Sequence, residues 1–424
     1  MRTDCGTVLL VAPTPRGWGE TAFAVHLGKD LIASGWKVHS LTCDSTASLF
    51  HGSGIAVTTV CDSTIPLLGL MIDALDDAVR PAAIVLCDIV ASIRALKRAG
   101  VGPDSLFRRK TPITGVDTWN SAVAGPVMDM FGSEGLDAQA WLDKIPRRLL
   151  PVPFLNEDSG PGVCRFVPQG RALSVRVRRH LRRELGISDT EKLVLFCTSP
   201  WQHGPYRNPD GQRLAVAVPR LISQYLSELG PAVHLVHVGP SRYDGLSLSG
   251  DRYHWIQPQR ADIFESLLAG ADMLLSLNIS AVTTIRAVAL GVPVVVLGNS
   301  CRARTADGIN DFMGGAWHPI VEKNAPLLSP LYAFTLWPLG LKSYLQPTLA
   351  GNPFLKALRP LELLDGARVI ETIHELLFSP RAAADMRGMQ EAYKRRLQGL
   401  PTPAAALQGV LRDLIGNERT YEAA

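Results

Sequence analysis

Short apolar runs alternate with amphipathic segments along most of the chain. Residues 7–12 (TVLLVA) form the first run, and a loop rich in Pro and Gly at 13–19 separates it from an amphipathic helix predicted at 21–34. Further strands in the first part of the chain are predicted at 37–41, 56–60, 82–87 and 112–116. Strand-length apolar runs that alternate with helices are typical of a parallel, doubly wound sheet.

The pattern is interrupted at 149–170, where PVPF, NEDSGPG and VPQG follow one another. So many turn residues in succession predict an interdomain linker. After it come an Arg-rich helix predicted at 174–185, which we expect to present a solvated face, and strands predicted at 193–198, 233–238 and 253–256. The chain is therefore predicted to hold two α/β domains, residues 1–165 and 166–400.

The segment 253–297 is the most informative part of the second domain. It is predicted to form strand, helix, strand, helix and strand, and its central strand at 272–277 is followed by Asn278, Ser280, Thr283 and Thr284. The exposed N–H groups at a helix start, together with nearby hydroxyls, make such a position a natural anion site. We expect a phosphate pocket at this edge of the sheet.

The same segment resembles the nucleotide-binding part of the GT-B glycosyltransferases, most closely the inverting enzymes that use nucleotide-diphosphate sugars. The resemblance rests on Trp255 with Pro258-Gln259, on the run from Asn278 to Thr283, and on Gly291-Val292-Pro293. It implies an α/β fold of two doubly wound Rossmann-like domains that face a cleft. It also implies transfer of a sugar from such a donor to a hydroxyl or amine of a small-molecule, possibly natural-product, acceptor.

The resemblance assigns donor-binding roles in the second domain. In the family, a Trp-x-Pro-Gln turn flanks the nucleobase and a His-x-Gly-x-x-Ser run holds the diphosphate; here Asn278, Ser280 and Thr283 take the His, Gly and Ser positions. Arg286 replaces a Glu that grips the ribose, and the family's sugar-contacting Asp/Glu-Gln pair is not visible. The loop after 193–198 often contacts the donor phosphates, with His203 as a candidate charge. The expected donor-binding residues are Thr198, Ser199, His203, Trp255, Gln257, Gln259, Asn278, Ser280, Thr283, Thr284 and Arg286.

The first domain is expected to supply the catalytic groups. Laid over the family's Gly-x-Gly-His loop, Glu20 falls on the position of the general base, which takes the acceptor proton. Asp88 and Asp117 each end a predicted strand and could orient the base or hold the acceptor, although an Asp at such a position is also a routine helix cap.

Three readings compete with the transferase. Gly17–Ala22 fits G-x-G-x-x-A and Asp44 ends the second strand, as in NAD-dependent oxidoreductases, but Pro13–Arg16 lengthen the loop beyond what that fingerprint needs. A nucleotide-sugar epimerase or hydrolase would keep the fold and change the reaction. A catalytically silent partner protein would fit the missing Glu at position 286.

The last part of the chain departs from regular alternation. Residues 299–360 are Pro-rich and aromatic, and we expect an insertion that shapes one wall of the cleft. Residues 361–396 are predicted to form the paired closing helices common at the end of GT-B chains. A C-terminal helix in 401–424 is expected to return to the first domain.

Composition limits the remaining possibilities. The chain has 424 residues, a hydrophobic content of 46% and a net charge of +4, which allows two ordinary domains and gives no support to nucleic-acid binding. Seven cysteines without ligand spacing predict reduced, buried thiols. No motif implies a metal, and no cofactor is expected besides the nucleotide-sugar co-substrate.

The ends and apolar runs of the sequence address localisation. No run approaches the ~18 apolar residues of a membrane helix, and Asp4 interrupts any signal-peptide pattern. We therefore expect a cytoplasmic protein. Preference for Arg over Lys and frequent Ala suggest a GC-rich bacterium, whereas the sugar, the acceptor and the oligomeric state are not encoded in any recognisable motif.

Overall fold

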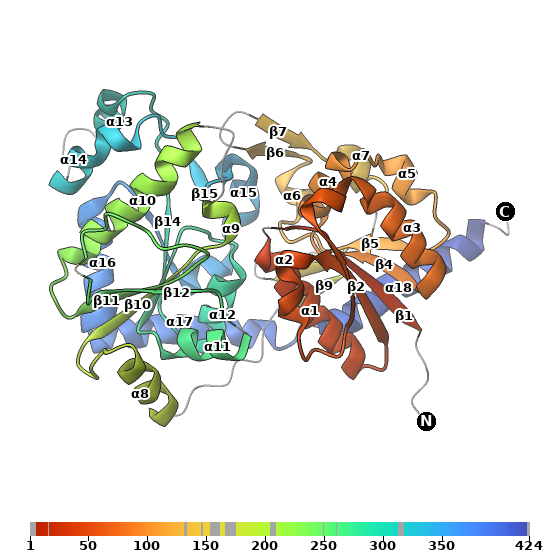
Figure 1. The fold of residues 1–424 in the computed structure, drawn as a ribbon, viewed down its shortest axis with the longest axis horizontal. Helices are drawn as coiled ribbons and strands as arrows, with labels where there is room; N and C mark the ends of the chain where they lie inside the picture. Colours follow the sequence, from red (N-terminus) through yellow and green to blue (C-terminus); the bar gives the residue numbers. More distant parts are fainter. Residues whose placement is uncertain are drawn as a thin grey trace. The chain divides into compact units, whose positions relative to one another are not determined.

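The computed structural model describes residues 6–421 except 16, 131–133, 146, 153–161, 166–174, 204–208, 249, 260 and 313–317. The chain divides into two compact units (Figure 1). Unit 1 comprises residues 1–127, 136–166 and 396–424, and unit 2 comprises 128–135 and 167–395. This division differs from the predicted boundary at 165 because 128–135 belong to unit 2, and its return to unit 1 at 396 accompanies the C-terminal helix expected to do so.

Unit 1 is built on a five-stranded parallel sheet in the order β3-β2-β1-β4-β5. The strands are β1 (Thr7–Ala12), β2 (Lys37–Cys43), β3 (Ala56–Val60), β4 (Ala83–Leu86) and β5 (Ile113–Gly115). β1 and β4 lie in the middle of the sheet and are buried almost completely, which explains their uninterrupted apolar sequences. The main helices are α1 (Trp18–Ala33), α3 (Leu68–Val79) and α4 (Ile89–Arg98).

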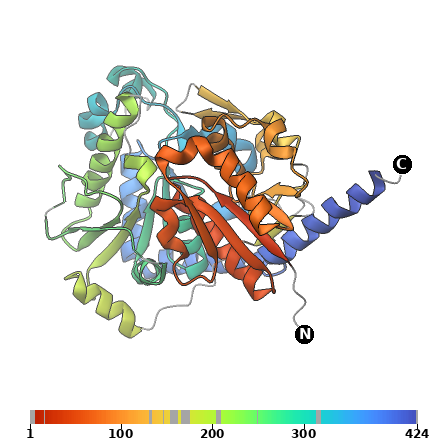
Figure 2. The ribbon, with the colours of Figure 1, turned by 45° about the vertical axis from the view of Figure 1, so that its right-hand side comes forward.

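Shorter elements complete unit 1. They are α2 (Asp44–Ala47), η1 (Ser48–Phe50), η2 (Asp62–Leu67), α5 (Pro103–Phe107), α6 (Ser121–Ala124), α7 (Gln139–Leu142), β8 (Leu150–Val152) and β9 (Val163–Arg165). The C-terminal helix α18 (Pro403–Tyr421) packs against α1 and β9 of the same unit (Figure 2). The Ala404 amide donates to Asp30 Oδ2 at 2.8 Å and ties the start of α18 to α1.

Unit 2 repeats the same strand order with one more strand, β12-β11-β10-β13-β14-β17, and all neighbours are parallel. The strands are β10 (Lys192–Cys197), β11 (Val233–Val238), β12 (Tyr253–Ile256), β13 (Met273–Ser276), β14 (Val294–Gly298) and β17 (Arg359–Glu362). Both sheets are thus the doubly wound kind that the alternating pattern predicted. β17 is an edge strand at a place where helices alone were expected.

Helices cover both faces of the second sheet. They are α8 (Val175–Glu184), α9 (Pro200–His203), α10 (Pro209–Ser227), α11 (Ala261–Gly270), α12 (Val282–Leu290), α16 (Gly366–Phe378) and α17 (Pro380–Leu397). Because right-handed crossovers to opposite sides of β10 place their helices on opposite faces, α10 lies on one face and α11 and α12 lie on the other.

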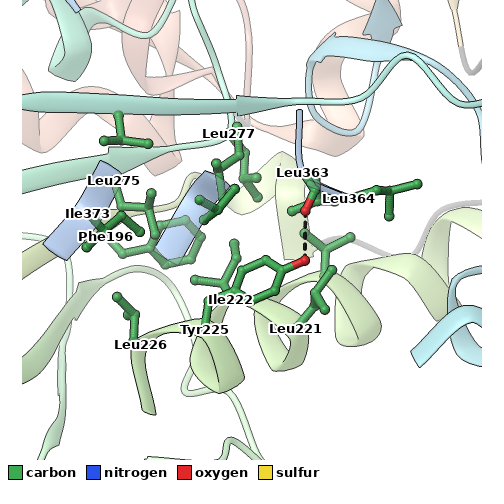
Figure 3. Close-up of a cluster of buried hydrophobic side chains, with 14 of the residues drawn as sticks. Phe196, Leu221, Ile222, Tyr225, Leu226, Leu275, Leu277, Leu363, Leu364 and Ile373 are labelled. Atoms are coloured by element: carbon green, nitrogen blue, oxygen red, sulfur yellow. Dashed lines mark hydrogen bonds between the residues drawn. The ribbon is translucent and has the colours of Figure 1, made fainter. Parts of the chain in front are cut away.

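The main core of unit 2 lies between α10, α16 and the sheet. Figure 3 shows Tyr225 of α10 pointing into this cluster of apolar side chains, with its hydroxyl on the Leu363 carbonyl at 2.9 Å. Burial raises the pKa of the Tyr225 phenol above its ordinary value. The carbonyl contact satisfies the one polar atom that this aromatic ring brings into the core.

The predicted insertion at 299–360 is more regular than the sequence suggested. It contains α13 (Ala306–Phe312), α14 (Pro319–Leu328), β15 (Phe334–Leu336), β16 (Gly340–Leu341), α15 (Lys342–Leu349) and η3 (Pro353–Ala357). β15 and β16 form an antiparallel hairpin, and β6 (Val127–Met130) and β7 (Glu134–Asp137) extend it into a sheet ordered β15-β16-β6-β7. Strands of two to four residues carry little periodicity, so the sequence could not reveal them.

The Arg-rich helix α8 is not simply a solvated face. Arg182 is buried and donates to Asp272 Oδ2 at 3.0 Å and to the Ser188 carbonyl at 3.0 Å, and Arg178 also pairs with Asp272. α8 packs on α11, so these contacts dock the helix onto the sheet at the amino end of β13. No helix in the described part of the chain is long and apolar enough to cross a membrane.

Candidate functional site

Each sheet has a position where the strand order reverses, between β1 and β4 in unit 1 and between β10 and β13 in unit 2. Loops at the carboxyl ends of such strands diverge and form the usual ligand site of a doubly wound sheet. The predicted site residues lie in loops and helices that follow these or neighbouring strands, except Trp255, which lies in β12 itself.

Glu20 lies in the first turn of α1, directly after the loop that follows β1. Its carboxylate folds back over Gly17, so closely that a Cβ at position 17 would overlap with it. Burial and the negative charge of Asp88 raise the pKa of Glu20 to about 7, while its own backbone N–H and Arg94 act in the opposite direction. A carboxyl group with such a pKa can accept a proton near neutral pH.

Asp88 follows β4 and caps α4. Its Oδ1 accepts the Ala91 amide at 2.7 Å, and Oδ2 accepts the Thr118 hydroxyl at 3.3 Å. Burial raises its pKa, the hydrogen bonds from Ala91 and Thr118 lower it, and Asp117 raises it further. The structure therefore brings Glu20 and Asp88 close enough at the switch point of unit 1 for the charge of Asp88 to act on Glu20.

The Asp117 side chain stabilises the loop that follows β5. It accepts the amide and the hydroxyl of Ser121 at 2.8 and 2.9 Å, and Arg148 Nη1 at 3.1 Å. The adjacent Asn120 has a left-handed backbone with φ 55°, which these contacts hold in place. The geometry supports a positioning role for Asp117, whose charge reaches the pair through Asp88, and gives no support to direct contact with a substrate.

In unit 2 the start of α12 has the properties of an anion site. The N-cap residue Ala281 supplies no side-chain cap, so the first amides of the helix have no side-chain acceptor. Asn278 is only 6% exposed, and its Oδ1 has no hydrogen-bond partner within the described residues. Ser280 and Thr283 lie beside this helix start and are only partly buried.

Thr284 has a different place from the one expected. It is fully buried, and its hydroxyl donates to the Asn278 carbonyl at 3.2 Å. Thr284 therefore shapes the turn before α12 and does not present its hydroxyl to a ligand.

The loop after β10 joins a network that the sequence did not reveal. Thr198 Oγ1 lies 2.7 Å from Nε2 of both His203 and His237. His237 Nδ1 lies 2.9 Å from the Tyr253 hydroxyl, and the rings of His203 and His237 each stack on Tyr243 with centroids 4.7 Å apart. His237 and Tyr253 sit on apolar strands, where a lone His or Tyr is indistinguishable from an ordinary core residue.

The charge expected on His203 is absent at neutral pH. Burial lowers the pKa of His203 to about 4, and burial together with His203 lowers that of His237 to about 3. Ser199 contributes through its backbone, since its amide donates to Gln202 Oε1 at 2.8 Å. Any anion at this loop therefore meets neutral hydrogen-bond donors.

The end of β12 carries the expected nucleobase segment. Trp255 donates its indole N–H to the Gly239 carbonyl at 3.0 Å, and Gln259 Nε2 donates to the Gln257 carbonyl at 2.7 Å. Gln257 is exposed and Gln259 is partly buried. Trp255 is thus tied to the loop after β11.

Arg286 does not present a free charge. It is buried, forms an ion pair with Glu265 of α11, and lies over the Phe264 ring at 5.4 Å. The carboxylate missing from position 286 is present in the same region on the neighbouring helix. Only the three-dimensional packing of α11 on α12 shows this exchange.

A further polar cluster was missed, at the carboxyl ends of β14 and β17. Glu362 Oε2 accepts the Ser300 amide at 2.7 Å, and its Oε1 contacts both the Ser300 hydroxyl and Lys342, the latter at 3.2 Å. Ser300 lies more than 40 positions before both Lys342 and Glu362 in the sequence, so no local motif could have marked this cluster. Among the described residues no group of three or more His, Cys, Asp or Glu is arranged to hold a metal ion.

Comparison with solved structures shows the fold. The chain is similar to the spinosyn rhamnosyltransferase SpnG complexed with thymidine diphosphate, with a TM-score of 0.53 and 16% identity over 95% of this chain and 99% of that one. It is also similar to Phytolacca americana UGT2 complexed with UDP-2fluoro-glucose and pterostilbene, with a TM-score of 0.52 and 14% identity over 96% of this chain and 99% of that one. A UDP-N-acetylglucosamine 2-epimerase has the same fold, with a TM-score of 0.51 and 12% identity over 98% of this chain and 96% of that one. The fold is that of the GT-B glycosyltransferases.

Sequence comparisons add a family. No curated protein matches the chain. A family model described as "Family of unknown function (DUF6365)" matches residues 27–416.

Proposed function

The chain belongs to the DUF6365 family, and from its GT-B fold and the two half-sites described above we propose that it is a glycosyltransferase. It moves a sugar from a nucleoside-diphosphate donor to a hydroxyl of a small-molecule acceptor. Unit 1 supplies the general base and unit 2 supplies the donor site.

The single observation that carries the proposal is the environment of Glu20. Its carboxylate is held over Gly17 at the carboxyl end of β1, and burial with Asp88 raises its pKa to about 7. An ordinary Glu in the first turn of a helix would be exposed and ionised, and its charge would only interact favourably with the helix dipole. A partly buried Glu whose pKa is raised by burial and by a neighbouring carboxylate at a switch point is instead typical of acid–base sites.

The reaction needs a base and a stabilised leaving group. Glu20 takes the proton of the acceptor hydroxyl, the acceptor oxygen forms a bond to the anomeric carbon, and the bond from that carbon to the diphosphate oxygen breaks. Attack from the side opposite the leaving group inverts the anomeric centre. The amides at the start of α12, with Ser280 and Thr283, stabilise the departing diphosphate, so no metal ion is required in this proposal.

The same loop geometry weighs against a dinucleotide cofactor in unit 1. The Glu20 carboxylate lies above the first turn of α1, where a dinucleotide fingerprint would place its pyrophosphate. Two like charges at that position repel each other. The Glu265–Arg286 pair places a carboxylate near position 286, which favours an active donor site over a silent partner protein.

The test is donor turnover by the wild-type chain and by Glu20→Gln. With a panel of nucleoside-diphosphate sugars and hydroxylated acceptors, we expect the variant to lose at least 100-fold in kcat and to keep its affinity for the nucleoside diphosphate. Glu322→Gln is the control, because Glu322 is an exposed Glu in the first turn of α14. Full activity in Glu20→Gln removes Glu20 from the mechanism, and turnover of donor without acceptor identifies an epimerase or a hydrolase.

A further inference from the structure

Thr198 and His203 belong to a continuous chain of polar side chains whose members come from three strands or the loops that follow them. The chain begins at Tyr253 of β12, whose hydroxyl lies 3.0 Å from the Tyr243 amide and 2.9 Å from His237 Nδ1. It continues through His237 and Thr198 to His203. It ends at Ser241, whose hydroxyl lies 2.9 Å from His203 Nδ1 and is exposed.

The number of protons fixes the direction of this chain. The Tyr243 amide donates to the Tyr253 oxygen, so the Tyr253 O–H can donate to His237 Nδ1. A neutral imidazole carries one N–H, so His237 Nε2–H then donates to Thr198, and the Thr198 hydroxyl donates to His203 Nε2. His203 therefore carries its proton on Nδ1 and donates it to Ser241. Every donor from Tyr253 to His203 in this arrangement has an acceptor, and the Tyr243 hydroxyl, 3.1 Å from His203 Nε2, can donate to that same nitrogen.

The opposite direction leaves a donor unsatisfied. If His203 carried its proton on Nε2, Thr198 would donate to His237 Nε2, and His237 Nδ1–H would donate to Tyr253. The Tyr253 oxygen would then accept twice, and its own buried O–H has no other acceptor within the described residues. Leaving a buried donor without an acceptor lowers the population of this arrangement at least several-fold.

Two neighbours hold the chain rigidly. A Cβ at position 239 would overlap with Thr198 Oγ1 and His237 Nε2, so Gly239 leaves the space that the Thr198–His237 hydrogen bond needs. The Trp255 indole donates to the Gly239 carbonyl and fixes this glycine from the other side.

The direction of the chain decides what the exposed end offers to a ligand. When Ser241 accepts from His203 Nδ1–H, its own O–H points outward as a donor. In the opposite arrangement Ser241 would donate inward and present only lone pairs, which repel an anion. The exposed Arg242 follows directly, with its guanidinium carbon 5.6 Å from the Tyr253 ring centroid. This end of the chain is therefore suited to an anion.

The register of the sheet places Thr198, in the middle of this hydrogen-bond chain, next to the strand that leads to the donor site. Phe196 pairs with Leu275 across β10 and β13, so Thr198 lies beside Leu277, one residue before Asn278 and close to the start of α12. Gln202 Nε2 donates to the Trp337 carbonyl at 3.5 Å, and the Trp337 amide donates to the Leu277 carbonyl at 3.2 Å, which connects the two loops.

We propose that Tyr253 and His237 are positioning residues of the donor site: they orient the proton on His203 so that the Ser241 hydroxyl is a fixed donor to the phosphate oxygens of a nucleoside diphosphate. This inference rests on the proposed function for the identity of the ligand. The direction of the hydrogen bonds from Tyr253 to Ser241 does not depend on the proposed function.

The charged and titratable groups around His203 agree with a neutral imidazole. From β11 it faces His237, from the following loop Tyr243, and through His237 it faces Tyr253 of β12, with Arg242 and Asp244 beside that phenol. Burial lowers the pKa of both histidines, so neither is protonated at pH 7. Donor binding therefore requires no proton uptake at His203.

The first test measures the tautomer without any ligand. Nitrogen NMR of the histidine-labelled chain at pH 7, with His203 assigned through His203→Gln, is expected to show a single Nδ1–H form. Tyr253→Phe removes the O–H that sets the direction and is expected to give a mixture of both tautomers. Tyr225→Phe is the matched control, because it also removes a buried hydroxyl from unit 2, and it should leave His203 unchanged.

The second test measures affinity by calorimetry with UDP, TDP and the unphosphorylated nucleosides. Ser241→Ala is expected to weaken nucleoside-diphosphate binding about tenfold and to leave nucleoside binding unchanged. Tyr253→Phe should weaken it about twofold, in proportion to the lost tautomer. Ser247→Ala, an exposed Ser in the same loop, is the control.

The outcomes separate the inference from the function on which it rests. An Nε2–H or doubly protonated His203 in the wild-type chain overturns the orientation. Wild-type affinity in Ser241→Ala overturns the role of Ser241 even if the chain binds nucleoside diphosphates. Failure of the wild-type chain to bind any nucleoside diphosphate overturns the ligand and the proposed function together, while the single Nδ1–H form would still establish the orientation.

Discussion

Glu20 shows how far one residue can be understood from its sequence context. Its place in the first turn after β1 follows from the strand and helix pattern, and the resemblance to GT-B enzymes suggests a base there. Its burial and its coupling to Asp88 depend on the packing of β1 beside β4, which no local pattern encodes. The same holds for Arg286, whose partner Glu265 lies on another helix, and for His237, which looks like a core residue in its strand.

The first prediction concerns stability as a function of pH. The pKa of Glu20 rises from 4.5 to about 7 on folding, so the folded chain binds more protons than the unfolded chain between these values. The stability that this group contributes is complete below pH 4.5 and is lost as pH rises through 7. Glu20→Gln cannot ionise, and its free energy of unfolding should exceed that of the wild type by about 1–3 kcal/mol at pH 8 and by little at pH 4.5.

Denaturant melts at pH 4.5, 6 and 8 check this prediction. Glu322→Gln, which changes an exposed Glu, should show no such dependence on pH. A constant difference between Glu20→Gln and the wild type across the three pH values would show that Glu20 has an ordinary pKa.

The second prediction concerns the glycine under Glu20. Gly17 has an ordinary extended backbone with φ −98°, so Gly17→Ala is not opposed by backbone strain, but its Cβ would displace the Glu20 carboxylate. We expect Gly17→Ala to lower kcat at least tenfold, because misplacing a catalytic group by about 1 Å has effects of that order. Gly102→Ala is the control, since a Cβ there meets nothing within 4 Å. Equal activity of the two variants would argue that the position of Glu20 is unimportant.

At the scale of elements, the positions of most strands could be predicted from the sequence, but the strands with which they pair could not. The runs at 7–12, 56–60, 233–238 and 253–256 match β1, β3, β11 and β12 residue for residue. β1 and β11 are buried parallel strands with continuous apolar sequences, and β3 and β12 are edge strands rich in β-branched or aromatic residues. The hairpin of β15 and β16 and its extension by β6 escaped prediction, since short strands that pair with a segment about 200 residues away leave no local trace. α8 looked solvated because its arginines are polar, although two of them dock onto Asp272.

The third prediction concerns the start of α12. Ala281 is an N-cap without a side-chain acceptor, so Ala281→Asp should stabilise the helix by about 1 kcal/mol. The added carboxylate would occupy the proposed anion site and should weaken nucleoside-diphosphate binding at least tenfold. Ala281→Ser caps the same amides without a charge and should stabilise the helix while retaining most of the affinity. Melting and calorimetry on both variants decide whether the uncapped amides serve a ligand, which tight binding by Ala281→Asp would contradict.

The fourth prediction concerns the docking of α8. Arg182 is 3% exposed and holds Asp272 and two carbonyls, so Arg182→Ala leaves the partly buried Asp272 with Arg178 as its one cation and removes the donor from the two carbonyls. We expect a loss of about 3 kcal/mol in the free energy of unfolding. Arg183 lies exposed on the same helix, and Arg183→Ala should change it by less than about 0.5 kcal/mol. Similar melts for the two variants would mean that α8 contributes through its apolar face alone.

At the scale of the whole molecule, both units repeat the same strand order, and the chain visits unit 1 twice. The two domains and the closing helices follow from the alternating pattern, whereas the interruption predicted as a linker at 149–170 contains β8 and β9 of unit 1 and meets unit 2 only at 167. The exchange of 128–135 into unit 2 does not follow from the pattern, because membership of a sheet is decided by pairing across the fold. Neither the sugar nor the acceptor is fixed at this scale, since GT-B folds carry several reactions.

The fifth prediction concerns the return of α18. Ala404, Leu407 and Val410 are buried in unit 1, and the start of the helix is tied to Asp30. A chain that ends at residue 400 should expose the apolar surface of α1 and β9, and should lower the melting temperature of one transition by several degrees. Differential scanning calorimetry checks this, and an unchanged melting profile would show that α18 is dispensable for unit 1.

The central claim is that the chain binds the nucleoside-diphosphate part of a sugar donor. The most direct measurement is calorimetric titration of the wild-type chain with UDP, TDP, GDP and NAD. We expect saturable binding of at least one nucleoside diphosphate, no binding of NAD, and a loss of at least tenfold in affinity in Ala281→Asp. Binding of NAD alone, or binding of no nucleoside diphosphate, would contradict it.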